Sequence, residues 1–129
     1  MIAGAASGPR YPVVMNTART IFTLVRHGET SANEAGLWHG STDTALSERG
    51  QRQASRVADY LRERHADARA VYASPLSRAR DTAGAIASRL EIRLRLDAQL
   101  VEYDLGRWEG LPYRVLHSEM RLFDNIRQD

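Results

Sequence analysis

The chain has 129 residues, which suffices for one domain around one hydrophobic core. Its 18 basic residues are all arginine and are nearly balanced by 16 acidic residues, so the net charge is only +2. Because arginines and acids are interspersed, no basic stripe indicates binding to nucleic acid. The lack of cysteine excludes disulfides, thiolate metal ligands and a thiol nucleophile. No apolar run approaches the roughly 20 residues that a membrane span requires, so no membrane association is expected.

The N-terminal region divides into a tail and a first strand. Residues 1–19 are rich in Ala, Gly, Ser and Pro and lack the apolar segment of a secretory signal, so we expect a loosely ordered tail. The run 21–25 is apolar without polar alternation, which is typical of a strand covered on both faces. We therefore predict a strand over residues 20–26. It ends in a cation, an imidazole and a glycine, namely Arg26, His27 and Gly28.

A loop and a long helix follow the first strand. The loop 27–46 is rich in glycine and polar residues and includes a short helical turn around 29–36. A helix is predicted over residues 47–65, with Ser47 as its N-cap. Its apolar residues recur at helical spacing and predict a buried face formed by Ala54, Val57, Ala58 and Leu61.

The second half alternates strand and helix again. Residues 70–73 form a short apolar run, which predicts a second strand. Ser74 and Pro75 predict the cap and first turn of a second helix that extends to Leu90. Residues 92–96 alternate between apolar side chains and arginine, which is typical of a half-exposed strand at a sheet edge. After the loop 100–111, apolar residues predict one or two short amphipathic helices at Val115, Leu116, Leu122, Phe123 and Ile126.

This alternation predicts an α/β fold with a mostly parallel sheet, in which ligands bind beyond the carboxyl ends of the strands. Three loops then meet at one edge of the sheet, at residues 27–33, 74–78 and 98–108. We expect this edge to gather four chemically active side chains: Arg26, His27, Arg78 and Glu102.

Two arginines around one imidazole indicate an anionic ligand, and a phosphoryl group with three terminal oxygens suits them better than a carboxylate. On its own, His27 also fits a base, a metal ligand or a surface residue at a strand end. Within this cluster, a neutral His27 can attack phosphorus directly. Glu102 can protonate the leaving oxygen and then activate water. This chemistry requires no metal and no cofactor.

Four sequence blocks carry a family resemblance. Residues 26–30, read as Arg-His-Gly-Glu-Thr and followed by Asn33, resemble the signature of the histidine phosphatase superfamily, which includes phosphoglycerate mutases. Residues 46–54 resemble the start of the next helix in this family, and residues 74–83 resemble the block that carries its second phosphate-binding arginine. Residues 100–110 resemble the block with its proton donor. The Gly-x-Trp-Glu-Gly pattern at 106–110 is closer to the phosphatase branch than to the mutases.

The resemblance implies a three-layer α/β sandwich of the phosphoglycerate mutase type and assigns roles to single residues. It implies that His27 is the phosphorylated nucleophile and Glu102 the general acid and base. Asn33 is implied as a phosphate ligand, although its residue type also fits a turn or helix cap. The remaining implied contacts are Arg26 and Arg78 with the phosphoryl group, and His39 and Gly40 with the substrate.

The sequence departs from the family in one respect. Members carry a second active-site histidine at the end of a later strand, which packs beside the strand that carries the nucleophile. None of the histidines at 39, 65 and 117 fits this position. We therefore expect residues 20–129 to be the N-terminal portion of a histidine phosphatase domain, with exposed apolar surface, weak stability and self-association through open sheet edges.

Two function classes follow from these residues. The first is an enzyme, either a phosphomonoester hydrolase or a mutase-type phosphotransferase, that acts through phosphohistidine on a phosphorylated small molecule. The second is a non-catalytic phosphate-binding remnant. A cytoplasmic location is expected, since the lack of cysteine is compatible with a reducing compartment.

Overall fold

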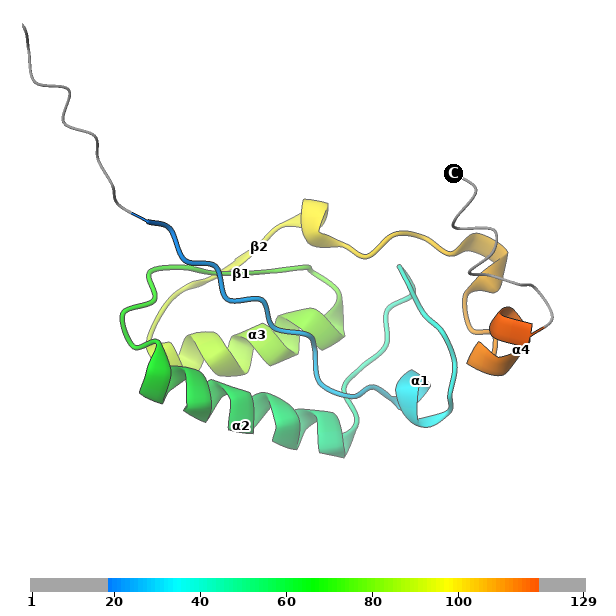
Figure 1. Cartoon of the computed structure of the whole chain (residues 1–129), viewed down its shortest axis with the longest axis horizontal. Coiled ribbons are helices and arrows are strands. Elements are labelled where there is room, and N and C mark those ends of the chain that lie inside the picture. Colours follow the sequence, from blue (N-terminus) through cyan, green and yellow to red (C-terminus); the bar gives the residue numbers. More distant parts are fainter. Residues whose placement is uncertain (1–18, 119–129) are drawn as a thin grey trace, which may run out of the picture.

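The computed structural model describes residues 19–118, and its main elements alternate between helix and strand (Figure 1). The two strands pair in parallel, with Val71 opposite Leu94 and Ala73 opposite Leu96. The predicted α/β class with a parallel sheet is confirmed. The main elements are α2 (Glu48–Arg64), β1 (Val71–Ala73), α3 (Ser77–Leu90) and β2 (Leu94–Leu96).

Shorter elements flank this unit and lie in the loops that the sequence places near the site. The turn predicted around 29–36 is a four-residue helix, and the loop 100–111 contains one 3₁₀ turn and borders another. The segment after Pro112 begins with a six-residue helix. These elements are α1 (Ser31–Glu34), η1 (Ala98–Leu100), η2 (Gly106–Trp108) and α4 (Tyr113–Ser118).

Helix α2 has the cap and the buried face that its sequence predicts. The Ser47 hydroxyl accepts a hydrogen bond from the Gly50 N–H at 3.1 Å, which satisfies one of the free donors of the first turn. Ala58 and Leu61 of α2 are buried against Ile86 of α3 and form the centre of the core. Helix α3 also packs on β1 and β2, so the described residues contain the sheet and one helical layer.

Helix α3 begins at Ser77, and the prediction that it begins at Ser74 and Pro75 is wrong. Its N-cap position is Leu76, whose side chain makes no capping bond. The Asp43 carboxylate instead accepts hydrogen bonds from the N–H and the hydroxyl of Ser77, both at 2.8 Å. The first turn is therefore capped from a distant loop, which local sequence does not reveal.

The prediction of a covered strand over residues 20–26 is also wrong. This segment, blue in Figure 1, forms no strand before it reaches α1. Its apolar side chains face solvent, with exposed fractions of 81% for Ile21, 83% for Phe22 and 94% for Leu24. A strand requires a hydrogen-bonded neighbour, and the described residues provide none for this segment. The expected exposure of apolar surface is confirmed.

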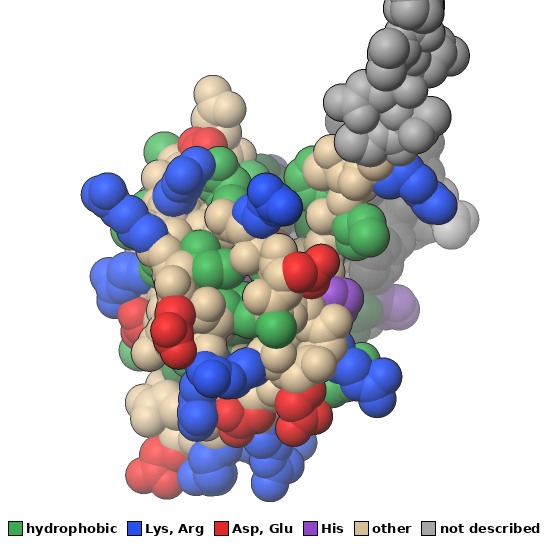
Figure 2. Space-filling view, turned by 90° about the vertical axis from the view of Figure 1, so that its left-hand side faces the viewer, with side chains coloured by type: hydrophobic (Ala, Val, Ile, Leu, Met, Phe, Trp, Pro, Cys, Tyr) green, Lys and Arg blue, Asp and Glu red, His purple; other side chains and the backbone are tan. Residues whose placement is uncertain are grey.

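Residues 1–18 of the predicted tail at 1–19 lie outside the described residues, as do the predicted helical positions Leu122, Phe123 and Ile126. Leu116 of α4 is fully buried, as its apolar pattern predicts. On the face shown in Figure 2, arginine and acidic side chains are interspersed, as their order in the sequence predicts. No helix in the described part of the chain is both long and apolar enough to cross a membrane.

Candidate active site

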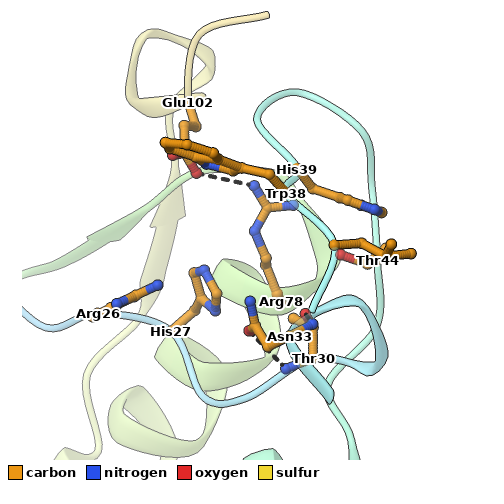
Figure 3. A pocket seen from close by; sticks show the side chains of 10 residues that line it. Arg26, His27, Thr30, Asn33, Trp38, His39, Thr44, Arg78 and Glu102 are labelled. Carbon is orange, nitrogen blue, oxygen red and sulfur yellow. Dashed lines mark hydrogen bonds and ion pairs between the residues drawn. The ribbon is translucent and has the colours of Figure 1, made fainter. Parts of the chain in front are cut away.

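A cavity of about 260 Å³ opens where the loop after residue 26, the loop 37–44 and the start of α3 meet (Figure 3). The structure brings six of the seven predicted site residues into its wall, and His65 and His117 do not line it. The six residues are Arg26, His27, Asn33, His39, Arg78 and Glu102.

One hydrogen bond defines the reactive nitrogen of His27. Its Nδ1 lies 2.7 Å from the carbonyl oxygen of Gly28. Because a carbonyl oxygen only accepts, Nδ1 carries the proton and Nε2 keeps its lone pair. Burial of the ring lowers the pKa of His27, and the charges of Arg78 and Arg26 lower it further, against the opposing effects of the Gly28 bond and Glu102. The site therefore favours a neutral imidazole.

The backbone beside His27 is held against α2 and α3. The Gly28 N–H donates to the Thr82 hydroxyl at 3.1 Å, and that hydroxyl donates to the Arg78 carbonyl at 2.8 Å. A Cβ on Gly28 would collide with the carbonyl oxygen of Gly50 in α2. The lack of a side chain at Gly28 therefore permits a close approach of this loop to α2.

Glu29 joins the loop after His27 to the start of α2. Its carboxylate accepts hydrogen bonds from the Ser47 hydroxyl and from Arg49, both at 3.1 Å. Its N–H donates to the Gln53 side chain at 2.8 Å. The first two of the sequence blocks noted above thus contact each other directly, and this contact fixes the position of His27.

Arg78 is buried, with only 3% of its surface exposed, and most of its guanidinium donors are hydrogen-bonded. Its Nη1 donates to the Thr42 carbonyl at 2.9 Å, and its Nη2 donates to the Gly40 carbonyl at 2.6 Å. Nη2 also lies 3.3 Å from the Glu102 carboxylate. These bonds compensate the burial of a cation and leave the Nε–H and one Nη1–H for an anionic ligand.

Glu102 and Arg26 are the accessible charged groups of the cavity. The Glu102 side chain is 46% exposed and reaches Arg78 from the segment after η1 (Figure 3). Arg26 is exposed beside His27, and none of the described acidic side chains forms an ion pair with it. Arg26 is therefore available to an anionic ligand, and the exposed part of the Glu102 carboxylate faces the cavity while it contacts Arg78.

Asn33 caps α1 and also lines the cavity. Its side-chain oxygen accepts a hydrogen bond from the Thr30 N–H at 3.0 Å, and the Thr30 hydroxyl accepts one from the Asn33 N–H at 3.2 Å. This capping box begins α1. Because the cap uses only the oxygen, the amide nitrogen of Asn33 stays available at the cavity wall.

His39 and Gly40 differ in their relation to the cavity. His39 lines it, and its Nδ1 is buried without a hydrogen-bond partner, as is the hydroxyl oxygen of Thr44 on the same wall. Buried polar atoms are normally paired, so these two indicate where a ligand or water binds. Gly40 does not line the cavity, and its backbone instead bonds to Arg78 and Glu109. No cluster of metal-binding side chains occurs among residues 19–118.

Sequence reasoning missed Glu109, which is the most strongly hydrogen-bonded carboxylate near the site. Although desolvation opposes its charge, hydrogen bonds from Thr42 and from the backbone of Leu105, Gly40 and Ser41 lower the pKa of Glu109 to about 2. The Trp-Glu-Gly pattern marked this residue as part of a block but did not indicate its contacts. The contacts with Gly40 and Ser41 join segments that are more than 60 residues apart.

Comparison with known proteins identifies related chains. A sequence profile of the histidine phosphatase superfamily (branch 1) matches residues 22–129. A bifunctional protein of Mycobacterium tuberculosis is 43% identical over 94 residues, which are 73% of this chain and 26% of that protein. The adenosylcobalamin/alpha-ribazole phosphatase of Salmonella typhimurium is 41% identical over 96 residues, which are 74% of this chain and 46% of that protein.

The fold of the chain is also similar to that of a solved phosphatase structure. The mycobacterial glucosyl-3-phosphoglycerate phosphatase in complex with VO₃ superposes with a TM-score of 0.68 at 35% identity. The match covers 75% of this chain and 49% of that one. The chain thus spans between about a quarter and a half of the length of these relatives.

Proposed function

The chain belongs to the histidine phosphatase superfamily, and we propose that its cavity hydrolyses a phosphomonoester through a phosphohistidine on His27. The observation that carries this proposal is the hydrogen bond from the His27 Nδ1–H to the Gly28 carbonyl. It leaves Nε2 as an unprotonated nucleophile directed by a fixed ring, beside two cations that attract the phosphoryl group.

The reaction has two steps. In the first, the Nε2 lone pair attacks phosphorus, the bond from phosphorus to the ester oxygen breaks, and Glu102 gives that oxygen a proton. In the second, Glu102 takes a proton from water, the water oxygen attacks phosphorus, and the P–N bond breaks. Inorganic phosphate leaves, and both His27 and Glu102 return to their starting states.

The charge on the transferred group is held by Arg26, Arg78 and the amide of Asn33. Phosphoryl transfer depends chiefly on positioning and charge stabilisation, which two guanidinium groups supply. Removing one such group typically lowers kcat by about 10²–10³-fold. Beyond the phosphate, the unpaired atoms of His39 and Thr44 would bind a polar group of the substrate.

The substrate class is a small phosphorylated metabolite. Two relatives are named as phosphatases of alpha-ribazole and glucosyl-3-phosphoglycerate compounds, and one was solved with VO₃. The mutase-type alternative has no specific support in the described residues. Phosphatase chemistry is therefore the better assignment for this site.

A second candidate function is phosphate binding with little turnover. The exposed segment that leads to His27 favours it, because a segment without a covering neighbour holds its nucleophile less firmly. A misplacement of about 1 Å can lower a rate roughly 100-fold. The same exposed side chains, Ile21, Phe22 and Leu24, support the proposal that the chain self-associates.

Hydrolysis of para-nitrophenyl phosphate by the full chain tests both functions. The enzyme proposal expects turnover that His27→Ala abolishes, that Glu102→Gln slows, and that the control His65→Ala leaves unchanged. Thermal stabilisation by inorganic phosphate without turnover would support the binding function instead. If the chain shows no turnover and is not stabilised by inorganic phosphate, both functions are contradicted.

A further inference from the structure

Glu109 lies outside the cavity but is hydrogen-bonded to the loop 37–44, whose carbonyl groups accept hydrogen bonds from Arg78. Its Oε1 accepts hydrogen bonds from the N–H groups of Gly40 at 3.1 Å, Ser41 at 2.9 Å and Leu105 at 3.1 Å. Its Oε2 accepts a second bond from Gly40 at 3.0 Å. One carboxylate thus fixes two consecutive peptide units of the loop 37–44.

The second of these peptide units, Gly40–Ser41, contacts Arg78 on the side opposite to Glu109. The Ser41 N–H and the Gly40 carbonyl belong to the same planar peptide group. Its N–H points to the Glu109 carboxylate, and its carbonyl accepts from the Arg78 Nη2 at 2.6 Å. The peptide dipole therefore lies between an anion and a cation, and each hydrogen bond in such a chain strengthens the next.

The surrounding structure leaves this arrangement little freedom. A Cβ on Gly40 would collide with the Tyr103 carbonyl oxygen and would lie 2.9 Å from the Glu109 Oε1. Backbone hydrogen bonds from Trp38 to Leu111 and from Gly110 to Trp38 hold the two segments side by side. The low pKa of Glu109, about 2, keeps the carboxylate charged throughout the neutral range.

We propose that Glu109 is a positioning residue that orients the Arg78 guanidinium toward the phosphoryl group through the Gly40–Ser41 peptide. This role rests on the proposed function of the cavity, because the orientation matters only if Arg78 binds phosphate. Glu109 itself does not line the cavity, so it acts on the ligand only through the residues that it positions.

Glu109→Gln tests the role with little change in size. The amide nitrogen cannot accept a hydrogen bond, so at least one of the loop N–H groups loses its acceptor. We expect the affinity of the full chain for inorganic phosphate to fall about tenfold, measured by titration calorimetry well below the unfolding temperature. Glu63→Gln, the same change on the exposed side of α2, is the control and should leave the affinity unchanged.

A double-mutant cycle separates positioning from general stability. In an Arg78→Lys background, which lacks the planar fork, Glu109→Gln should weaken phosphate binding by less than about twofold. Equal phosphate affinity in Glu109→Gln and the unaltered chain would overturn the proposal. An equal loss in both backgrounds would do so as well, because the effect would not pass through Arg78.

A measurement without ligand keeps the test independent of the proposed function. The ¹⁵N resonances of the Arg78 guanidinium should show slow rotation in the unaltered chain and faster rotation in Glu109→Gln. If the rotation of the Arg78 guanidinium is the same in Glu109→Gln as in the unaltered chain, Glu109 does not orient Arg78, whether or not phosphate binds. Phosphate binding that depends on Glu109 but is not accompanied by turnover would contradict the hydrolase and leave the positioning role in place.

Discussion

At the scale of single residues, the site depends on which atoms are already engaged in hydrogen bonds. His27 uses Nδ1 and keeps Nε2, Asn33 uses its oxygen and keeps its amide nitrogen, and Arg78 keeps two of its donors. In each side chain, some polar atoms are thus fixed by hydrogen bonds within the protein while others remain free to face the cavity. Such anchoring fixes reactive groups in place before the substrate binds.

The pKa of His27 predicts the acid side of the pH profile. In the proposed mechanism the His27 nucleophile must be neutral, and burial together with Arg78 and Arg26 lowers its pKa below the ordinary 6.5. Turnover should therefore be retained as the pH falls through 6.5 and be lost only at lower pH. Arg26→Gln removes one of the cations and should move this loss to higher pH. A profile of kcat/KM against pH with an acid limb above 6.5 would contradict the assignment.

Asn33→Asp separates the cap that Asn33 forms on α1 from its proposed contact with phosphate. Aspartate retains the oxygen that caps α1, so the stability should change little. It lacks the amide donor and places a negative charge at the cavity, so the affinity for inorganic phosphate should fall by about tenfold or more. Thermal unfolding and phosphate titration measure the two effects. A phosphate affinity equal to that of the unaltered chain would restrict Asn33 to capping.

The gathering of His27 and the site's charged side chains in one place could be predicted from the alternation of helix and strand along the chain. The strand predicted before His27 is nevertheless absent, and α3 begins later than predicted. His27, Arg78 and Glu102 were expected at one sheet edge, and one cavity contains all three. Glu109 and Thr44 were not found, since their significance depends on loops brought together only by folding. Sequence reasoning finds reactive side chains more readily than the groups that orient them.

At the scale of elements, α2 and the loop after His27 are joined backbone to backbone at Gly28 and Gly50. Helical periodicity correctly predicted α2 and most of α3, because one buried face determines each helix. The strand at 20–26 was predicted wrongly, because a strand also depends on neighbours that its own sequence does not contain. The start of α3 was misplaced because its cap is Asp43, from another loop.

Two glycine-to-alanine variants test the packing of α2. In Gly50→Ala, the new methyl group would collide with the Glu29 carbonyl oxygen, so unfolding should become easier by about 1–3 kcal/mol. Gly84→Ala in α3 meets no atom within 4 Å and should stabilise the helix by about 0.5–1 kcal/mol. Urea unfolding measures both. A lower free energy of unfolding in Gly50→Ala and a higher one in Gly84→Ala would support the contact between Gly50 and Glu29. Equal changes in the two variants would show that the α2 interface tolerates a side chain.

At the scale of the whole molecule, the helices share a small core while the segment leading to the site is exposed. Ile21, Phe22 and Leu24 are among the most exposed apolar side chains in the described residues. An apolar surface of this kind favours contact with another protein surface. The loop that carries His27 is therefore connected to a segment whose apolar side chains are largely exposed in the described part of the chain.

Replacing two of these side chains tests the proposed self-association. The double variant Phe22→Ser, Leu24→Ser should shift the chain toward the monomer in sedimentation experiments, because it removes apolar area from the contact. Tyr60→Ser changes an exposed aromatic residue on α2 and serves as the control. If the unaltered chain is already monomeric at high concentration, or if both variants associate equally, the exposed segment is not the contact.

Trapping the phosphorylated chain tests the role of His27 most directly. After brief incubation with a ³²P-labelled phosphomonoester and alkaline quenching, the label should reside on the peptide that contains His27. It should be lost on mild acid treatment, as expected for a P–N bond, and should be absent from His27→Ala. Turnover without labelling of this peptide, or an acid-stable label on another residue, would contradict the account.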